Sequence, residues 1–318
     1  MSHVIPIRAM LYEPTYKGQW DAFVRGAKNG VFLFYRDYLE YHADRFSDFS
    51  ILFFQDERLV ALLPANRAND VVVSHGGLTF GGVVTDSKMT VERMLDVFSA
   101  LVDLLRARDV KKLVYKAIPH IYHVLPAEED LYALFMQDAR LFRRDVSSTV
   151  VGGPKLPLSR SRRRVLKHAQ GLGLQVRPSR DFLGFMAIAE ASLQARHGVR
   201  PVHTGTEMQL LADRFPENIK LFTANRNEEI LGGVIMYESQ MVAHGQYRNA
   251  TVEGMKLGAL DLIMDVLLND VYKDKHFHDF GSSTLDDGRK LDEDLIQNKE
   301  SYGGRAIVYD SYELSLYM

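Results

Sequence analysis

The sequence predicts a mixed α/β (α+β) protein built from two similar units. Two observations support this prediction. Apolar runs of strand length alternate with longer segments whose apolar residues recur at helical spacing, and the order strand, strand, strand, helix, strand occurs twice along the 318 residues. A chain of this length buries enough apolar surface to hold a core without disulfides or a structural metal.

A predicted β-hairpin begins each copy of this order. In the first copy, residues 51–55 (ILFFQ) and the run LVALLPA lie on either side of a charged turn at 56–58. In the second copy, residues 219–224 (IKLFTA) and the run ILGGVIMY flank a polar turn at 225–229. A chance echo between two α/β segments is the alternative interpretation, and the shared order and spacing favour duplication.

A third strand with a His-Gly pair follows each hairpin, around His75 in the first half and His244 in the second. A helix comes next in both halves. Residues 91–105 carry its apolar face in the first half, and residues 257–271 repeat that face with one polar exception, Asp261. Each helix leads into a short strand, KLVYKAIP in the first half and HFHDFGSS in the second. Each half therefore resembles one α/β unit.

The segment between the halves predicts a domain border. Residues 127–145 have the apolar pattern of a long helix, and a Gly/Pro stretch (VGGPKLP) follows. A basic helix begins in SRSRRRVLKHA, and residues 182–197 form another helix. We predict two domains, residues 1–152 and residues 153–318. Because no flexible linker separates them, we expect the two halves to pack against each other.

The composition excludes several classes of function. The chain has no cysteine, which excludes disulfide scaffolds, cysteine zinc sites, iron–sulfur clusters and a cysteine nucleophile. The net charge of −2 and a pI of about 6.6 give no positive field for nucleic acid, so a nucleic-acid partner is not expected. The motifs of P-loop NTPases, serine hydrolases and zinc proteases are absent, and no metal site is expected. No apolar stretch has the length of a signal peptide or membrane span, so we expect a cytoplasmic protein without membrane insertion.

Residues 246–259 (QYRNATVEGMKLGA) combine the end of a strand, a Gly-containing turn and the start of a helix near Leu257. Loop amides and a helix N-terminus together hold anions such as pyrophosphate. A plain strand–helix turn, with Gly chosen for its conformation, is the alternative. The segment resembles the GNAT acyltransferases, whose fourth strand and Gly loop hold the pyrophosphate of an acyl-CoA. Residues 254–259 provide the small residues of that loop but lack its leading Gln or Arg.

The GNAT resemblance implies acyl-CoA as the co-substrate. It places the donor on one strand end, the following turn and the Ser-Ser pair after the last strand. The residues implied in donor binding are Gln246, Tyr247, Gly254, Lys256, Gly258, Ser282 and Ser283.

The C-terminal part of the chain resembles the Fem-type peptidyltransferases, which are tandem-GNAT enzymes. Residues 279–283 (DFGSS) are similar to their Asp-Phe-Gly strand, and residues 295–304 (LIQNKESYGG) to their Phe-Lys-x-x-Phe-Gly segment. Lys299 aligns with the Lys of that segment, and Asn298 stands in place of its first Phe. A third match, to an Arg-x-x-(Ile/Val)-Lys-x-Ala pattern with the Val one position early, involves Arg163, Val165, Lys167 and Ala169. The resemblance implies two GNAT-like units over nearly the whole chain.

Fem-type enzymes transfer an amino acid from aminoacyl-tRNA to a cell-wall precursor, and they commonly carry a long helical arm that this chain has no room for. Similar tandem-GNAT proteins without the arm look like N-acyltransferases of nucleotide-linked amino sugars in surface-polysaccharide pathways, such as lipopolysaccharide and O-antigen precursors. We therefore expect acyl transfer from acyl-CoA to the amine of a nucleotide-linked amino sugar. Aminoacyl transfer from tRNA and a non-catalytic binding module are the alternatives. A duplicated fold supplies its own internal partner, so we expect a monomer.

Such a transfer needs a base for the attacking amine, donors for the oxyanion and a proton for the leaving thiolate. His244 is a candidate base, and Asp279 is a candidate acceptor for the ammonium or its proton; a structural histidine and a turn cap are the alternatives. Lys299 is a candidate for stabilising the developing charge and Tyr302 for protonating the thiolate, against a solvated lysine and a packed tyrosine. We expect direct attack on the thioester, because no cysteine and no Ser–His–Asp order is present.

Candidates for binding the acceptor substrate come from both halves. Arg163 and Lys167 lie in the basic helix, which either holds nucleotide phosphates or forms a solvated face. Lys116 and His120 follow the last strand of the first half, and we expect them to line a cleft between the halves.

Overall fold

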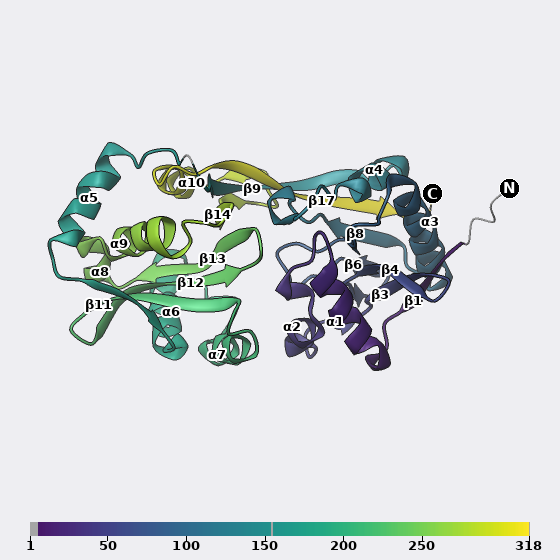
Figure 1. Ribbon diagram of the computed structural model, residues 1–318, viewed down its shortest axis with the longest axis horizontal. Helices are drawn as coiled ribbons and strands as arrows, with labels where there is room; N and C mark the ends of the chain where they lie inside the picture. Colours follow the sequence, from purple (N-terminus) through teal and green to yellow (C-terminus); the bar gives the residue numbers. More distant parts are fainter. Residues whose placement is uncertain (1–5, 154, 318) are drawn as a thin grey trace. The chain divides into compact units, whose positions relative to one another are not determined.

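The computed structural model describes residues 6–153 and 155–317, and the chain divides into two compact units (Figure 1). Of these residues, unit 1 contains 6–145, 286–289 and 308–317, and unit 2 contains 146–285 and 290–307. The first change of unit, after Asp145, lies close to the predicted border at 152/153. The C-terminal residues return to unit 1 because the second half of β17 (Arg305–Ser315) pairs with β8 (Lys112–Lys116).

Two sheets form the centre of unit 1. One is antiparallel throughout, with the strand order β1 (Ile7–Leu11), β3 (Ile51–Gln55), β4 (Arg58–Leu63) and β7 (Val84–Thr85). In the other, β8 pairs antiparallel with β17 and parallel with β6 (Val71–Val73), and the order continues through β5 (Asn66–Ala68) to β2 (Ser47–Asp48). Both β3 and β4 are buried along most of their length, which explains why they are continuous apolar runs.

The α-helices of unit 1 are α1 (Lys17–Gly26), α2 (Arg36–Leu39), α3 (Val91–Ala107) and α4 (Glu129–Met136). Single 3-10 turns occupy Pro14–Tyr16, Phe32–Phe34, Glu40–His42 and His120–Tyr122. Thr90 caps α3 by accepting a hydrogen bond from the backbone N–H of Arg93. The apolar face of α3, which includes Phe98 and Leu101, packs with β3, β4 and β8 into one core.

One mixed sheet forms the centre of unit 2. Its order is β10 (Gln175–Ser179), β11 (Ile219–Arg226), β12 (Glu229–Glu238), β13 (Val242–Ala250), β14 (Phe277–Ser282) and β9 (Arg140–Val151). Neighbouring strands are antiparallel except β13 and β14, which run parallel. A short ribbon of β15 (Thr284–Leu285) and β16 (Lys290–Leu291) follows β14.

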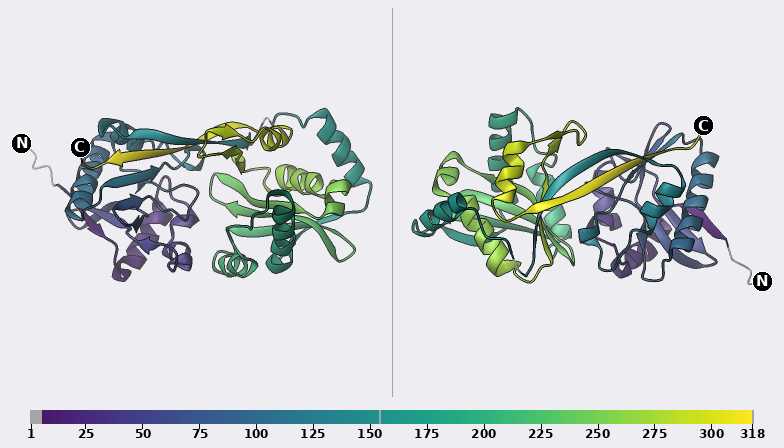
Figure 2. Two further views of the ribbon diagram at one scale, coloured as in Figure 1. Left: turned by 180° about the vertical axis from the view of Figure 1, so that it is seen from behind. Right: turned by 90° about the horizontal axis from the view of Figure 1, so that it is seen from above.

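The helical elements of unit 2 are α5 (Arg160–Gln170), α6 (Phe182–His197), α7 (Gly205–Arg214), α8 (Val252–Leu257), α9 (Ala259–Val266), a π-helical turn (Leu267–Val271) and α10 (Glu293–Glu300). Figure 1 shows α9 on one face of the sheet and α6 and α7 on the other. Figure 2 shows α5 on the side of α9, in agreement with the contacts between the two helices. Residues of α9, including Ile263 and Met264, pack on β11, β12 and β13 as the core of this unit.

The structure confirms several local predictions. Both predicted hairpins form, as β3–β4 and β11–β12. The predicted helices at 91–105 and 182–197 are α3 and α6, and the basic helix is α5. The mixed α+β class, with helices flanking large mixed sheets, is therefore confirmed. The second-half helix begins earlier than predicted, at Val252, and is interrupted at Gly258.

Two predictions about organisation are wrong. The expected long helix at 127–145 ends at Met136, because Asp138 takes a left-handed conformation (φ 54°) and the chain continues as strand β9. The expected strand does not include the His-Gly pair, because β6 ends at Val73 and His75 takes a left-handed conformation (φ 58°). β6 pairs with β5 and β8, and β4 has β7 as its outer neighbour. Apolar periodicity could not separate these arrangements, because partner choice depends on contacts distant in sequence.

No helix in the described part of the chain is long and apolar enough to cross a membrane.

Candidate functional site

The candidate site of unit 2 lies where β13 and β14 diverge. The two parallel strands pair at residues 242–244 and 277–279. Beyond this point β13 remains paired with β12, while β14 continues along β9 with an irregularity between Asp279 and Ser282. The last paired residues are His244 and Asp279. The divergence therefore exposes backbone and side-chain groups inside the sheet, where a regular sheet would bury them in its ladder.

His244 and Asp279 form a hydrogen-bonded pair at this point. The Nδ1 atom of His244 lies 2.7 Å from Oδ2 of Asp279. The second carboxylate oxygen of Asp279 accepts hydrogen bonds from the hydroxyls of Ser147 and Thr149 on β9, the latter at 3.1 Å. Asp279 is 2% exposed, so its charge depends on these donors for stabilisation. With Nδ1 oriented by the carboxylate, Nε2 of His244 is the nitrogen able to take up a proton.

Lys299 binds the backbone of the same segment of β14. It projects from α10, and its ammonium donates hydrogen bonds to the carbonyls of Gly281 (2.7 Å) and Ser282 (2.6 Å). These carbonyls belong to the irregular part of β14, so Lys299 fixes the conformation of that turn. Burial, together with the nearby Arg248, lowers the pKa of Lys299 to about 7, although Asp279 and Asp292 oppose the shift. Lys299 is thus buried and bonded, and the solvated-lysine alternative is wrong.

Tyr302 lies in a stack of aromatic rings and guanidinium groups. Its ring is 5.6 Å from that of Phe280, and the guanidinium of Arg162 lies over it at 4.3 Å. Arg248 approaches the rings of Phe280 and Tyr302 at 5.2 and 5.5 Å. Burial raises the pKa of the Tyr302 hydroxyl, so Tyr302 holds its proton at neutral pH.

A cavity of about 530 Å³ adjoins this stack within unit 2. Its lining comes from α5, α9, α10 and β13 and carries both signs of charge: Arg162, Arg248, Asp261, Asp292, Asp294 and Asn298 are among the lining residues. Arg162 is already paired with Asp261 (2.9 Å) and with Ser301. Arg248 donates one bond to Asn298 (3.1 Å), while its buried Nη1 has no hydrogen-bond partner in the described chain. An unpaired buried guanidinium favours an anionic ligand here.

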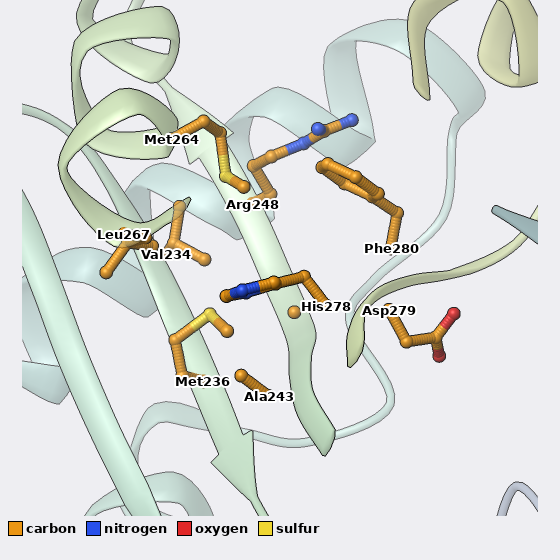
Figure 3. A pocket seen from close by; sticks show the side chains of 10 residues that line it. Val234, Met236, Ala243, Arg248, Met264, Leu267, His278, Asp279 and Phe280 are labelled. Carbon is orange, nitrogen blue, oxygen red and sulfur yellow. The ribbon is translucent and has the colours of Figure 1, made fainter. Parts of the chain in front are cut away.

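A second, smaller pocket of about 20 Å³ lies between α9 and the sheet (Figure 3). Its walls are mostly apolar, with Met236 and Met264 on opposite elements and the ring of His278 between them. Arg248 lines both this pocket and the larger cavity. Figure 3 shows the carboxylate of Asp279 turned away from the small pocket.

Comparisons with known proteins identify the architecture. No family model and no curated protein sequence matches the chain. Among solved structures, FemX superposes with a TM-score of 0.68 over 97% of both chains at 10% identity. The structure of L-PGS from Bacillus licheniformis gives 0.63 at 12% identity, over 96% of this chain and 92% of that one. A tandem GNAT protein from the clavulanic acid biosynthesis pathway gives 0.50 at 10% identity over 98% of both chains.

The chain has the tandem GNAT fold. At these identities the likeness establishes the architecture alone. The point of divergence between β13 and β14 lies in unit 2.

The predicted donor-loop residues have conformational and packing roles in the tandem GNAT fold of this chain. Thr251 caps the short helix α8 by accepting from the N–H of Gly254 (3.0 Å). A Cβ at Gly254 would lie 2.0 Å from the carbonyl oxygen of Leu231. Gly258 ends α8 in the left-handed region (φ 74°) and faces Val165 of α5. Lys256 is exposed on α8. No free glycine loop intervenes between β13 and α8, because Ala250 is followed directly by the cap.

The remaining predicted donor residues are dispersed around β13 and β14. Gln246 lies in an irregularity of β13, where the pairing to β12 shifts between Ile235 and Met236. The hydroxyl of Tyr247 contacts Nδ1 of His203 at 2.7 Å, and burial raises the pKa of Tyr247 to about 12. Ser282 is exposed and its hydroxyl contacts Thr284, whereas Ser283 is buried. His244 contacts Asp279, Tyr247 contacts His203, and Gly258 lines the large cavity.

The predicted acceptor residues occupy two separate elements. Arg163 and Lys167 are exposed on α5, and Arg163 donates to the carbonyl of Leu158. Lys116 ends β8 in unit 1, where its ammonium bonds the carbonyl of Leu78 and burial lowers its pKa to about 8. His120 is exposed in the following 3-10 turn.

Sequence reasoning missed Ser147, Thr149 and the special position of Arg248. The run RDVSSTVV carried a signal, since alternating residues on a strand share a face and Ser147 and Thr149 are two apart. Assigning its first part to a helix concealed that alternation. Arg248 lies on β13 opposite the buried Val234 of β12, and an arginine in a sheet of apolar strands is itself a signal of function. Within the described chain no group of three or more His, Asp or Glu is placed to hold a metal.

Proposed function

We propose that unit 2 transfers an acyl group to an amine at the point where β13 and β14 diverge. The observation that carries the proposal is the His244–Asp279 pair, with Asp279 buried and held by Ser147 and Thr149. A histidine oriented in this way through Nδ1 accepts a proton through Nε2. Its side chain is 13% exposed, so a substrate reaches it while bulk water is largely kept away.

The reaction proceeds by direct attack on the donor's thioester. His244 takes a proton from the amine as its nitrogen bonds to the thioester carbon, and the carbonyl oxygen becomes an oxyanion. The tetrahedral intermediate then expels the thiolate, and the amide forms. Tyr302, whose raised pKa keeps it protonated, supplies a proton to the thiolate and regains one from solvent, and His244 releases the proton of the amine to solvent. Lys299 holds the β14 turn against which these groups are arranged.

The donor in this proposal is an acyl-CoA whose diphosphate enters the 530 Å³ cavity. Arg248 contributes the cation, because its Nη1 is buried without a protein partner, and Asn298 fixes its orientation. Charge-assisted hydrogen bonds of this kind are about twice as strong as neutral ones. The acceptor is the amine of a nucleotide-linked amino sugar, which rests on the resemblance to tandem-GNAT N-acyltransferases without a helical arm.

Aminoacyl transfer from tRNA is the second candidate, because α5 displays an exposed basic face. Arg160, Arg163, Arg164 and Lys167 are all exposed on this helix, and it contains no acidic residue. Such a face attracts a phosphate backbone, and the binding weakens steeply with salt. The likeness to FemX and to L-PGS agrees with this candidate as well as with the first.

A ligand screen by thermal shift separates the two candidates. The purified chain is heated with CoA, acetyl-CoA and longer acyl-CoAs, with UDP- and dTDP-linked amino sugars, and with bulk tRNA. A ligand at about 100 times its dissociation constant adds about 2.7 kcal/mol to the free energy of unfolding. Stabilisation by an acyl-CoA and a nucleotide sugar supports the first candidate, and salt-sensitive stabilisation by tRNA alone supports the second.

A positive screen is followed by a test of the chemistry. Turnover is measured as release of free thiol from acyl-CoA in the presence of the amine that stabilised the protein. His244→Gln should lose at least about 100-fold in turnover with an unchanged melting temperature. If no ligand raises the melting temperature of the folded protein, both transfer reactions are contradicted and a binding module is favoured.

A further inference from the structure

The small pocket between α9 and the sheet is lined by His278, whose buried Nε2 lacks a hydrogen-bond partner among the described residues. His278 is 3% exposed, and its Nε2 has no hydrogen-bond partner within the described chain. The other ring nitrogen is bonded to the backbone of Tyr272. Because that nitrogen donates its proton to the backbone, the neutral ring presents the lone pair of Nε2 to the pocket. Burial lowers the pKa of His278 to about 4, which keeps the ring neutral.

The residues around Nε2 determine which chemical group of a ligand could donate a hydrogen bond to it. Val234, Met236, Met264, Leu267 and Phe280 make the walls apolar. The pocket of about 20 Å³ has room for about one group of the size of a water molecule. A cationic amine is disfavoured, since Arg248 lines the pocket and Lys155 and Lys275 both act electrostatically on His278. A hydroxyl fits the small volume, carries no positive charge and donates a hydrogen bond to Nε2.

The pocket is also joined to the proposed reaction site. Gly245 and Asp279, the residues at the divergence of β13 and β14, belong to its lining, and Arg248 is shared with the large cavity. A short acyl chain that passes between the diverging strands places only its end in this pocket, beside His278. The two methionines adapt their side chains to the shape of such a chain.

We propose that this pocket binds the end of a short hydroxyacyl group on the donor, with its hydroxyl donating a hydrogen bond to Nε2 of His278. The inference rests on the proposed acyl transfer in unit 2 and specifies its donor. A site built to bond a substrate hydroxyl discriminates strongly against the analogue that lacks it, because the buried acceptor is then left unpaired.

The test compares the dissociation constants of butyryl-CoA and 3-hydroxybutyryl-CoA for the whole chain by titration calorimetry. We expect 3-hydroxybutyryl-CoA to bind about tenfold more tightly. His278→Leu, of similar size without the acceptor, should abolish the preference. The matched control His276→Leu, at an exposed position two residues earlier, should retain it. Should His278→Leu fail to fold, His278→Asn withdraws the acceptor from the pocket and should lose the preference in the same way.

Each outcome is decisive. Equal affinity of the wild type for both compounds means that the pocket holds an ordered water only, and it overturns the hydroxyacyl proposal while acyl transfer stands. A preference that survives His278→Leu overturns it as well. If neither compound binds, the acyl-CoA donor itself is wrong, and the proposed function fails with it.

Discussion

The strand that follows the long helix ends differently in the two units. In unit 2, the part of β14 that pairs with β13 ends at Asp279, whose buried carboxylate is hydrogen-bonded to His244. Beyond this residue the two strands diverge. In unit 1, the corresponding strand β8 is followed along its parallel side by residues 74–82, which cross its end. Ser74 N–H bonds the carbonyl of Val114, and Gly81 N–H bonds that of Lys116.

The crossing segment packs against the end of β8, whereas the corresponding strand of unit 2 carries the His244–Asp279 pair. Leu78 and Phe80 are 5% and 3% exposed, and Phe80 packs on Tyr122 at 4.5 Å between ring centres. The hydroxyl of Tyr115 bridges to β7 by accepting from the N–H of Val83 and donates to Asp130. The same order of elements thus supports the candidate reactive centre in one unit and a packed core in the other. We infer that unit 2 alone carries the transfer chemistry.

The largest expected effect follows from removing the charge of Asp279. Asp279→Asn keeps the side-chain shape but no longer stabilises a protonated His244. We expect turnover to fall about 10³- to 10⁴-fold, by analogy with neutralising the carboxylate of a catalytic triad, with the chain still folded. Steady-state thiol release and a melting curve measure the two properties.

Asp130→Asn is the matched control for this prediction. Asp130 is the buried carboxyl of unit 1, where burial raises its pKa to about 6 and Tyr115 bonds it. Turnover should remain at the wild-type level in this variant. Loss of turnover in Asp130→Asn, or retention in Asp279→Asn, would contradict the assignment of the chemistry to unit 2.

The next effect concerns the packed end of unit 1. Phe80→Ala removes a buried ring and leaves a cavity among Phe34, Tyr122 and Tyr309. We expect the free energy of unfolding to fall by about 3–5 kcal/mol, measured by urea denaturation. Turnover per folded molecule should be unchanged. A variant that is stable but inactive would show that this segment takes part in the reaction.

A smaller effect is expected from Arg248→Met. The substitution keeps the apolar stem but removes the unpaired guanidinium from the large cavity. Binding of acetyl-CoA, followed by calorimetry, should weaken about 10- to 100-fold because charged hydrogen bonds are lost. Arg58→Met, which removes an exposed ion pair with Asp86 in unit 1, is the control and should bind normally. Equal affinities for the two variants would exclude Arg248 from the donor site.

The last effect is a pH dependence of stability that is common to both units. Burial lowers the pKa of Lys299 to about 7 and that of Lys116 to about 8. From these values up to about pH 10 the unfolded chain holds protons that the native chain has released, so stability rises with pH. Each group contributes at most about 1.4 kcal/mol per pH unit. Urea unfolding between about pH 7 and pH 9 should show the rise, and Lys299→Met should reduce it. An unchanged slope in that variant would mean that Lys299 is charged in the native state.

Two residues of the site show how much of it could be predicted from the sequence. His244 and Asp279 were predicted on neighbouring strands, and the structure joins them at 2.7 Å. Their support from Ser147 and Thr149 was missed, because β9 lies more than a hundred residues before β14 and was partly assigned to a helix. The α8 glycines were predicted as a donor loop; Gly254 packs closely against Leu231, and Gly258 packs against Val165 and also lines the large cavity. A glycine pattern does not distinguish ligand contact from helix packing.

The sequence by itself determined the local elements: the two hairpins, α3, α5 and α6, all of which follow from apolar periodicity and short-range turn and cap signals. The tertiary structure alone decided that β9 lies beside β14, that β6 is not the partner of β4, and that Nη1 of Arg248 is buried without a hydrogen-bond partner in the described residues. Local patterns depend on which face of one element is buried, and the chain encodes that within a few residues. Partner strands, buried charges and cavities depend on which distant segments meet, and that is set by packing of the whole unit.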